Sequence, residues 1–545
     1  MPRFNVMSHI QYFSMKRSSV WTVLCKSALR FLTVFFTACS LSACEPLSEF
    51  GRKLSGIEAN RKNEIQPAFT PLARTQERLI RGVYGELTLD VPSMNNEEQA
   101  DFLRDLLEGL VIFDSRGDIL PGVAERWENQ DDKLWRFYLR PQAKWSNGEP
   151  VVAQDFVDSW RKLALSDSPL KQSLMYINLL NAQAVTMQQL TPELLGVRAA
   201  DERILEIELD KPTPYLPKML THAAFLPTRG NMPAEFLSNG AYRFIRMRGN
   251  RIFLDKNPVY WNEANVTFNS VVYEKMAEDQ SPETIDWLES PKHASQAIYF
   301  PTLCTYFYRF NLQDPELSRR SVRTALVSMI SSQYIVRNEH LPALPLSDFL
   351  PRHMQTEQNQ DWQPSVVEPL LQQAGISAEK PLHITLTYDR GYPQENIANR
   401  LVRTWSQSEL IHVTPQPVSF SVLLEKQAKG EFQLIRSGWC ADYNDPSAFF
   451  NLLHGQHPDN KTGIDNAEIN QWLEQSLTVK TEAERTALYQ KIQHLVKQER
   501  YFLPLYQIQR AVYIHPSIRG FDLTNPTSTV YSKDLSRHST LPNQR

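Results

Sequence analysis

Apolar and polar positions alternate along several short stretches of the chain and recur at helical spacing along others. Between residues 381 and 439 the two patterns take turns, which predicts strand, helix, strand, helix, strand. Strands joined by helices pair in parallel, so we expect a parallel sheet with helices on its faces. The five segments are PLHITLTYD (381–389), QENIANRLVRTWSQS (394–408), IHVTPQPVS (411–419), FSVLLEKQAKG (420–430) and EFQLIRSGW (431–439).

The rest of the chain shows further helices and strands of the same two kinds. Asp105 and Glu108 fall opposite the apolar face of one predicted helix, so we expect them to face solvent. The pattern predicts helices at 100–113, 153–165, 320–330 and 482–499, strands at 85–91, 134–140, 301–312 and 501–514, and a hairpin at 238–261 that turns at Gly249 and Asn250.

The stretch GWCADYNDP, residues 438–446, combines an aromatic ring, a thiol and carboxylates just beyond a predicted strand. Asp445 and Pro446 predict the start of a helix, as N-cap and first helical residue. Asp442 then has no obvious structural task. Turns beyond the carboxyl ends of strands are where α/β folds bind ligands. From the residues alone, Asp442 is either a ligand contact in a cleft or a solvated loop carboxylate.

The amino terminus has the pattern of an export signal. Lys16 and Arg17 precede the apolar run FLTVFFTACSLSAC, residues 31–44. Its last four residues resemble the lipobox of bacterial lipoproteins, which implies cleavage after Ala43 and a lipid on Cys44. The alternative is an uncleaved anchor, although the run is shorter than the ~20 apolar residues of a spanning helix. The polar segment that follows, to about residue 76, predicts a tether.

Cysteine usage agrees with an exported protein. Of five cysteines, Cys25 and Cys39 leave with the predicted signal and Cys44 carries the lipid. Cys304 and Cys440 remain, and two thiols in an oxidising compartment predict a disulfide. Two buried free thiols are the alternative.

Charge and motifs exclude several functions. A net charge of -3 gives no reason to expect a nucleic-acid partner. We find no HExxH, GxxxxGK, GxSxG or CxxC motif, so we predict neither an enzyme nor a cofactor. His454 and His457 are close in sequence but lack metal-site spacing, so no metal site is predicted. Trp127, Trp135 and Trp145 are expected in the core rather than at a ligand.

Three runs carry a resemblance to a known family. Residues 121–160, LCTYFY at 303–308 and GWCADYN at 438–444 resemble the extracytoplasmic solute-binding proteins of peptide and nickel ABC importers, above all the oligopeptide-binding members. The resemblance implies an α/β, two-lobed periplasmic-binding-protein fold with mixed sheets and an extra small domain. The expected divisions are a signal peptide at 1–43, a tether at 44–80, lobe I at 81–118, 225–303 and 510–545, an extra domain at 119–224 and lobe II at 304–509.

The resemblance also assigns roles to residues. It implies a Cys304–Cys440 disulfide and makes Asp442 the acceptor of a peptide's terminal ammonium group. An extended peptide would pair with backbone edges on both sides. The implied ligand-binding residues are Asn95, Glu97, Arg436, Gly438, Trp439, Cys440 and Asp442, together with Phe420, Gln427 and Arg309, which replace residues that line the site in relatives.

The leading hypothesis is a lipid-anchored, monomeric receptor on the periplasmic side of the bacterial envelope, held to the cell membrane or the outer membrane. It captures short peptides and delivers them to an ABC permease. The alternative is an envelope sensory or accessory binding protein on the same fold, with a modified peptide, haem or a metal complex as ligand. An exported hydrolase is the third possibility, without a motif to support it.

Overall fold

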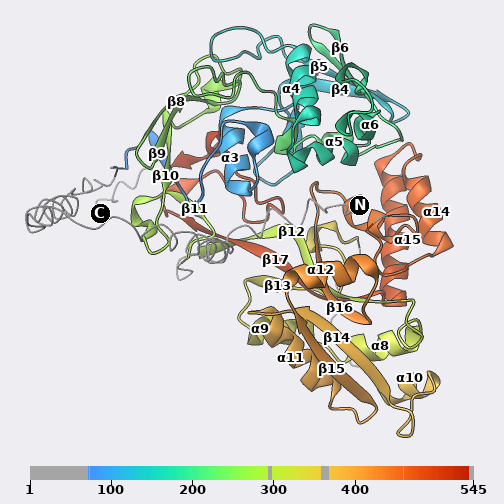
Figure 1. The fold of residues 1–545 in the computed structure, drawn as a ribbon. Coiled ribbons are helices and arrows are strands. Elements are labelled where there is room, and N and C mark those ends of the chain that lie inside the picture. The colour runs from blue at the N-terminus through green and yellow to red at the C-terminus, as the bar shows by residue number, and fades with distance from the viewer. Residues whose placement is uncertain (1–71, 73, 293–296, 357–366, 458, 539–545) are drawn as a thin grey trace, which may run out of the picture. The chain divides into compact units, whose positions relative to one another are not determined.

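One long mixed sheet runs through the part of the chain that the computed structural model describes, residues 72, 74–292, 297–356, 367–457 and 459–538 (Figure 1). Nearly all of this part belongs to a compact unit, Thr75–Arg545. The predicted signal peptide, most of the tether and Cys44 lie outside the described residues. The eleven strands are, in spatial order, β15 (Ile411–Val418), β14 (Leu382–Asp389), β16 (Leu434–Cys440), β12 (Ala297–Phe310), β17 (Phe502–Ile514), β11 (Trp287–Glu289), β1 (Arg78–Val83), β10 (Ser270–Lys275), β9 (Arg251–Lys256) and β8 (Tyr242–Arg248), with β13 (Ala343–Pro345) paired to β17.

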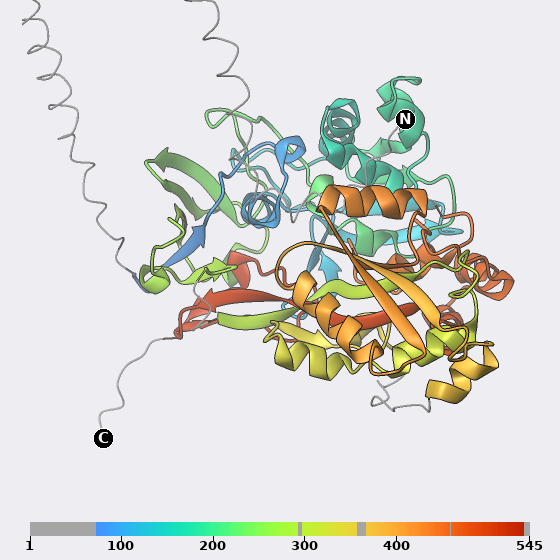
Figure 2. The same ribbon diagram turned by 60° about the horizontal axis from the view of Figure 1, so that its bottom comes forward.

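The predicted strand–helix alternation between residues 381 and 439 is confirmed. β14 pairs in parallel with both β15 and β16, so the connecting helices cross over the sheet. One face of β14 packs Ile384 and Leu386 against Leu401 of α11 (Gln394–Trp405). On the opposite face of the sheet, Leu423 of α12 (Phe420–Lys429) packs against Ile435 of β16. Figure 2 shows the yellow and orange helices gathered around this part of the sheet.

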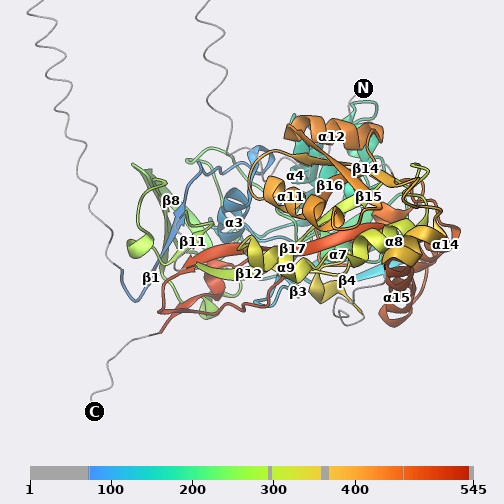
Figure 3. The same ribbon diagram turned by 90° about the horizontal axis from the view of Figure 1, so that it is seen from below.

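Two long strands, β12 and β17, connect this parallel part to the rest of the sheet. They run antiparallel to each other, and β17 continues along β11, which in turn pairs with β1 (Figure 3). Aromatic residues fill both sides of β12: Phe307 stands among Phe349 and Phe502, and Tyr306 stacks on Tyr506. The strand predicted at 501–514 is confirmed, and through β11 it reaches the part of the sheet that contains β1.

A smaller antiparallel sheet lies at 124–208. Trp145 is fully buried and Trp135 is 3% exposed, as the core assignment predicted, whereas Trp127 is half-buried. The hairpin of β8 and β9 is also confirmed. The small sheets are β4 (Ala124–Gln130), β5 (Leu134–Leu139), β7 (Ile204–Glu208) and β6 (Val197–Asp201), β2 (Val111–Phe113) with β3 (Ile119–Pro121), and β18 (Ile518–Arg519) with β19 (Ser536–Arg537).

Helices cover the sheets at both ends of the described chain. α4 and α15 have the predicted bounds, and α15 opens with a capping box between Thr481 and Glu484. No helix in the described ranges is both long and apolar enough to cross a membrane. The helices are α3 (Glu97–Leu106), α4 (Ala153–Leu165), α5 (Gln172–Tyr176), α6 (Ala182–Thr186), α7 (Leu216–Met219), α8 (Arg320–Ser328), α9 (Ser332–Asn338), α10 (Val367–Gln373), α11, α12, α13 (Ser447–Phe450), α14 (Ala467–Ser476) and α15 (Glu482–Glu499).

Three expectations about the amino-terminal part are wrong. The helix predicted at 100–113 ends at Leu106, and residues 111–113 form the strand β2. The segment 85–91 forms no strand, because β1 already occupies the place between β10 and β11. Asp105 and Glu108 are buried rather than exposed. Asp105 accepts a hydrogen bond from the Tyr273 hydroxyl at 2.7 Å, and Glu108 accepts one from the Trp261 indole at 2.6 Å. The domain boundaries remain a prediction, and β1 begins before residue 81.

Candidate functional site

The GWCADYNDP stretch begins in the last residues of β16. Antiparallel pairing places Cys440 directly opposite Cys304 of β12, and the two form a disulfide across 136 positions of sequence. The predicted pairing is therefore present in the structure. Gly438 is exposed, and a Cβ there would lie 3.0 Å from the backbone oxygen of Thr305. The absence of a side chain at Gly438 thus lets β16 lie close to the paired strand β12.

The turn after β16 is fixed by Asp445, whose side chain is 4% exposed. Its Oδ1 accepts a hydrogen bond from the Ser447 backbone N–H at 3.0 Å, and its Oδ2 pairs with the Lys218 ammonium at 2.9 Å. The capping role expected from sequence is thus present, although α13 begins at Ser447, one residue later than expected. Tyr443 stacks on Tyr215 at a centroid distance of 5.2 Å.

Asp442 has no such structural partner. Among the described residues, none donates a hydrogen bond to its carboxylate or forms an ion pair with it, and the residue is exposed. Protein atoms nevertheless surround the carboxyl group closely enough that desolvation raises its pKa to about 7, with the negative charge of Glu97 adding to the shift. An exposed, desolvated carboxylate without a counter-charge is prepared to accept a cation.

Glu97 and Asn95 lie at the amino end of α3, on the other side of this site. The Asn96 side chain accepts a hydrogen bond from the Gln99 N–H at 2.9 Å and so caps the helix. This cap holds Glu97 in the first turn, where its half-exposed carboxylate lies 3.9 Å from the Arg510 guanidinium. Asn95 is exposed. The predicted edge at residues 95–97 and Asp442 are therefore within electrostatic reach of each other.

The sequence analysis did not identify two further side chains that lie at the site. Burial raises the pKa of Tyr176 in α5 to about 12, and the charges of Asp442 and Asp459 add to the shift. Tyr176 thus brings a third element within range of Asp442. His353 Nε2 lies 2.9 Å from Asn444 Oδ1 in the turn. Neither residue stands in a motif, so only the tertiary structure connects them with Asp442.

Arg436, Phe420 and Gln427 form a group of their own beside β16. The Arg436 guanidinium lies 3.4 Å from the Asp389 carboxylate and 6.0 Å from the Phe420 ring centroid. Gln427 Nε2 donates to the backbone oxygen of Arg436 at 2.7 Å. All three hold β16 in place by internal contacts, and whether they also contact a ligand stays a prediction.

Arg309 and Trp439 also make internal contacts. Arg309 is 5% exposed, and burial lowers the pKa of its guanidinium to about 10. It donates to the backbone oxygen of Asp459 at 3.2 Å, while its Nε has no partner among the described residues. The Trp439 indole N–H donates to the Ala448 oxygen at 2.8 Å, which ties β16 to α13.

The histidine pair forms no metal centre. In the described part of the chain, no three His, Cys, Asp or Glu side chains lie close enough to hold a metal ion. The Nδ1 atoms of His454 and His457 accept backbone N–H groups of Gln456 and Asp459, so both rings shape the turn.

Comparison with known proteins identifies the class. Residues 118–461 match the bacterial extracellular solute-binding proteins, family 5, and the chain belongs to this family of binding proteins, which are not enzymes. A Haemophilus influenzae protein named only as a binding protein is 43% identical over 516 residues, covering 94% of this chain and 98% of its own length. The periplasmic oligopeptide-binding protein OppA of Salmonella typhimurium is 30% identical over 510 residues, covering 86% of this chain and 94% of its own.

Solved structures agree with this assignment. The unliganded open form of the periplasmic murein tripeptide-binding protein MppA superposes with a TM-score of 0.79 at 29% identity, covering 86% of this chain and 99% of that one. A second structure of the murein tripeptide-binding protein, from Escherichia coli, gives 0.62 with the same coverage. The chain has the α/β, two-lobed periplasmic-binding-protein fold with mixed sheets that the sequence predicted.

Proposed function

We propose that this protein captures short peptides outside the cytoplasmic membrane and delivers them to an ABC permease. The observation that carries the proposal is Asp442, an exposed carboxylate without a partner among the described residues, whose pKa desolvation raises to about 7. In this proposal the terminal ammonium group of the peptide supplies the missing counter-charge through charge-assisted hydrogen bonds.

The remaining contacts in this proposal are mostly backbone contacts. The exposed edge at Gly438 and Cys440 pairs with one side of an extended peptide, and the segment from Asn95 to Glu97 pairs with the other. Backbone pairing accepts many sequences, so one anchored amino terminus serves many peptides. The TM-score is 0.79 with the open, unliganded structure of the murein tripeptide-binding protein and 0.62 with the second structure of that protein. This difference supports a site that is open before the peptide enters.

The proposed anchor is a lipid on Cys44, which would hold a monomeric receptor at the cell membrane or the outer membrane. Intact mass spectrometry of protein extracted from membranes tests it. We expect a polypeptide that begins at Cys44 and carries acyl chains, and a soluble or unacylated product would exclude the lipid anchor.

A modified peptide is the second candidate ligand. It is supported by the likeness to a murein tripeptide-binding protein and by the replacement residues Phe420, Gln427 and Arg309. Calorimetric titration with the murein tripeptide and with linear tripeptides separates the two candidates, because the tighter ligand identifies the cargo.

Native mass spectrometry of the purified protein tests the proposed function. We expect the wild-type protein to carry a mixture of short peptides, and Asp442→Asn to lose it. Asp118→Asn serves as the matched control, since this carboxylate is 70% exposed in a distant turn. Retention of the same peptides by Asp442→Asn would exclude the assigned role of Asp442, and the absence of peptides from all three proteins under gentle purification would count against peptide cargo.

A further inference from the structure

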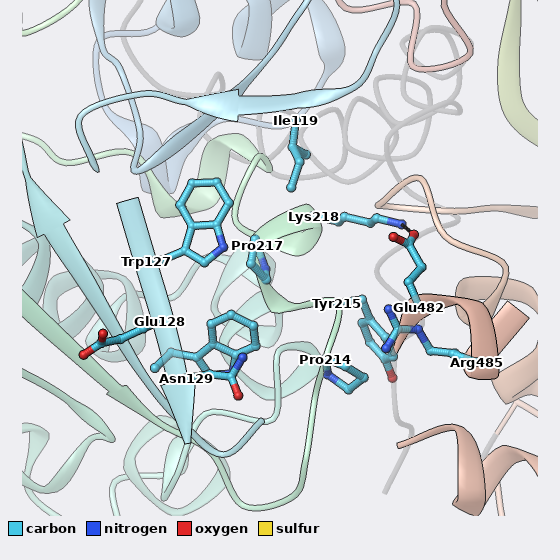
Figure 4. A pocket seen from close by; sticks show the side chains of 11 residues that line it. Ile119, Trp127, Glu128, Asn129, Pro214, Tyr215, Pro217, Lys218, Glu482 and Arg485 are labelled. Atoms are coloured by element: carbon cyan, nitrogen blue, oxygen red, sulfur yellow. Dashed lines mark ion pairs between the residues drawn. The ribbon is translucent and has the colours of Figure 1, made fainter. Parts of the chain in front are cut away.

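A hollow of about 320 Å³ lies between the small sheet of β4 and β5 and the first turn of α15 (Figure 4). The loop that leads into α7 forms another part of its lining. None of the residues discussed for peptide binding lines it. The lining residues that carry the argument are Trp127, Trp135, Tyr215, Lys218, Glu482 and Arg485.

Aromatic side chains give the hollow flat apolar walls. Trp127 is half-buried, while Trp135 and Tyr215 are 3% and 5% exposed. The Tyr215 ring is held in position by its stacking on Tyr443, with an angle of 9° between the ring planes. A volume of about 320 Å³ is at the small end of the range for ligand pockets, and it suits a molecule of one or two rings.

The cation at the hollow is Arg485, in the first turns of α15. Its guanidinium forms no hydrogen bond or ion pair with another described residue of the lining, and the charge of Asp132 acts on it from outside the lining. A bound anion at this place would gain a charge-assisted hydrogen bond from the guanidinium.

The acidic groups at the hollow are already engaged. Glu482 lies 4.0 Å from the Lys218 ammonium, which also pairs with Asp445. The side chain of Glu128 points away from the hollow (Figure 4), and its carboxylate accepts a hydrogen bond from the Tyr138 hydroxyl at 2.6 Å. The charged group of the lining that remains for a ligand is therefore the Arg485 cation, which favours an anionic ligand over a cationic one.

We propose that this hollow is a second ligand site that takes a small aromatic carboxylate. The ring of the ligand packs against Trp127 and Tyr215. Its carboxylate accepts a hydrogen bond from the Arg485 guanidinium. This site is independent of the proposed peptide anchor at Asp442, because the two share no residue.

Isothermal titration of the purified protein with naphthalene-2-carboxylate tests the proposal, and the neutral naphthalene-2-carboxamide serves as the matched probe. We expect saturable binding of one equivalent of the carboxylate. Binding should be about tenfold weaker for the carboxamide and about tenfold weaker for the carboxylate with Arg485→Gln, because each change removes one charge-assisted hydrogen bond.

Two control variants separate this site from other binding. Arg126→Gln should bind the carboxylate as the wild type does, because Arg126 covers the Tyr138 ring instead of the hollow. Asp442→Asn should also leave this binding unchanged. Equal affinity for the two probes, full retention by Arg485→Gln, or loss of binding in Asp442→Asn would each overturn the proposal. None of these outcomes would affect the evidence for peptide binding.

Discussion

The affinity for peptides should depend on pH in a direction set by Asp442. Desolvation raises the pKa of the free carboxyl group to about 7, with Glu97 adding to the shift, and only the ionised form attracts an ammonium group. Affinity should therefore rise as pH rises through 7. It should fall again once the peptide's amino group, with a pKa of about 7.7 to 8.0, loses its proton.

The size of the effect follows from the two ionisations. With a pKa of about 7, Asp442 is about 3% ionised at pH 5.5 and about three-quarters ionised at pH 7.5. The peptide amine loses about a third of its protonated form over the same range, so the net gain in affinity is about 15-fold. Because the ammonium group favours the ionised carboxylate, binding below pH 7 should also release a proton from Asp442.

Calorimetric titration of one tripeptide in buffers of different ionisation enthalpy measures both the affinity and the released proton. Asp442→Asn should remove the rise in affinity between pH 5.5 and 7.5. Glu97→Gln should move the midpoint of the rise to lower pH, because it removes a negative charge that raises the pKa of Asp442. An affinity that does not change with pH, or a pH dependence that persists in Asp442→Asn, would refute the reasoning.

Three further predictions concern the framework of the site, each measured by urea unfolding. Replacing Cys304 and Cys440 by serine should lower the free energy of unfolding by about 4 to 5 kcal/mol, because the disulfide closes a long loop, and an unchanged midpoint would contradict this. Lys218→Met should cost about 1–3 kcal/mol, since it leaves the buried Asp445 carboxylate without its cation; no loss would show that the pair contributes nothing. Arg309→Met should leave stability unchanged or raise it by about 1–3 kcal/mol, because the desolvation of this guanidinium outweighs its attraction to Asp459, and a clear loss would contradict that account.

The sequence correctly predicted those elements whose capping residues, apolar face or turn lie within the element or directly beside it. α15 has its apolar face within its own 18 residues and its capping box between the preceding Thr481 and Glu484, and the β8–β9 hairpin has its turn between its two strands. The segment 85–91 has an equally clear alternation of apolar and polar residues, but it forms no strand. Its leucines, Leu87 and Leu89, pack against the core without strand pairing, because pairing depends on a free neighbouring edge. No local pattern reports such an edge.

Charged residues in the interior were mispredicted for a related reason. Asp105 and Glu108 lie on the polar side of their sequence pattern, but their partners, among them Tyr273, Tyr260 and Ser532, are more than 150 residues away. Desolvation of such groups is offset by hydrogen bonds that only the tertiary structure brings together.

For the candidate site, sequence identified the turn after β16 and left Asp442 without a structural task. It could not indicate that the charge of Glu97 raises the pKa of this carboxyl group, or that the charge of Asp442 raises the pKa of Tyr176, because the three residues lie in separate elements. It also could not indicate that Arg309 is buried, since residues 302–310 of β12 are buried on both faces of a strand that lies between β16 and β17.

The central claim is that Asp442 receives the amino terminus of a peptide. Titration of the wild-type protein with one tripeptide and with its N-acetylated form, under the same conditions near pH 7.5, tests this claim most directly. We predict that acetylation weakens binding by about 10- to 100-fold, because it removes the charge and the donors that Asp442 accepts from. Equal affinity for the two forms would contradict the account.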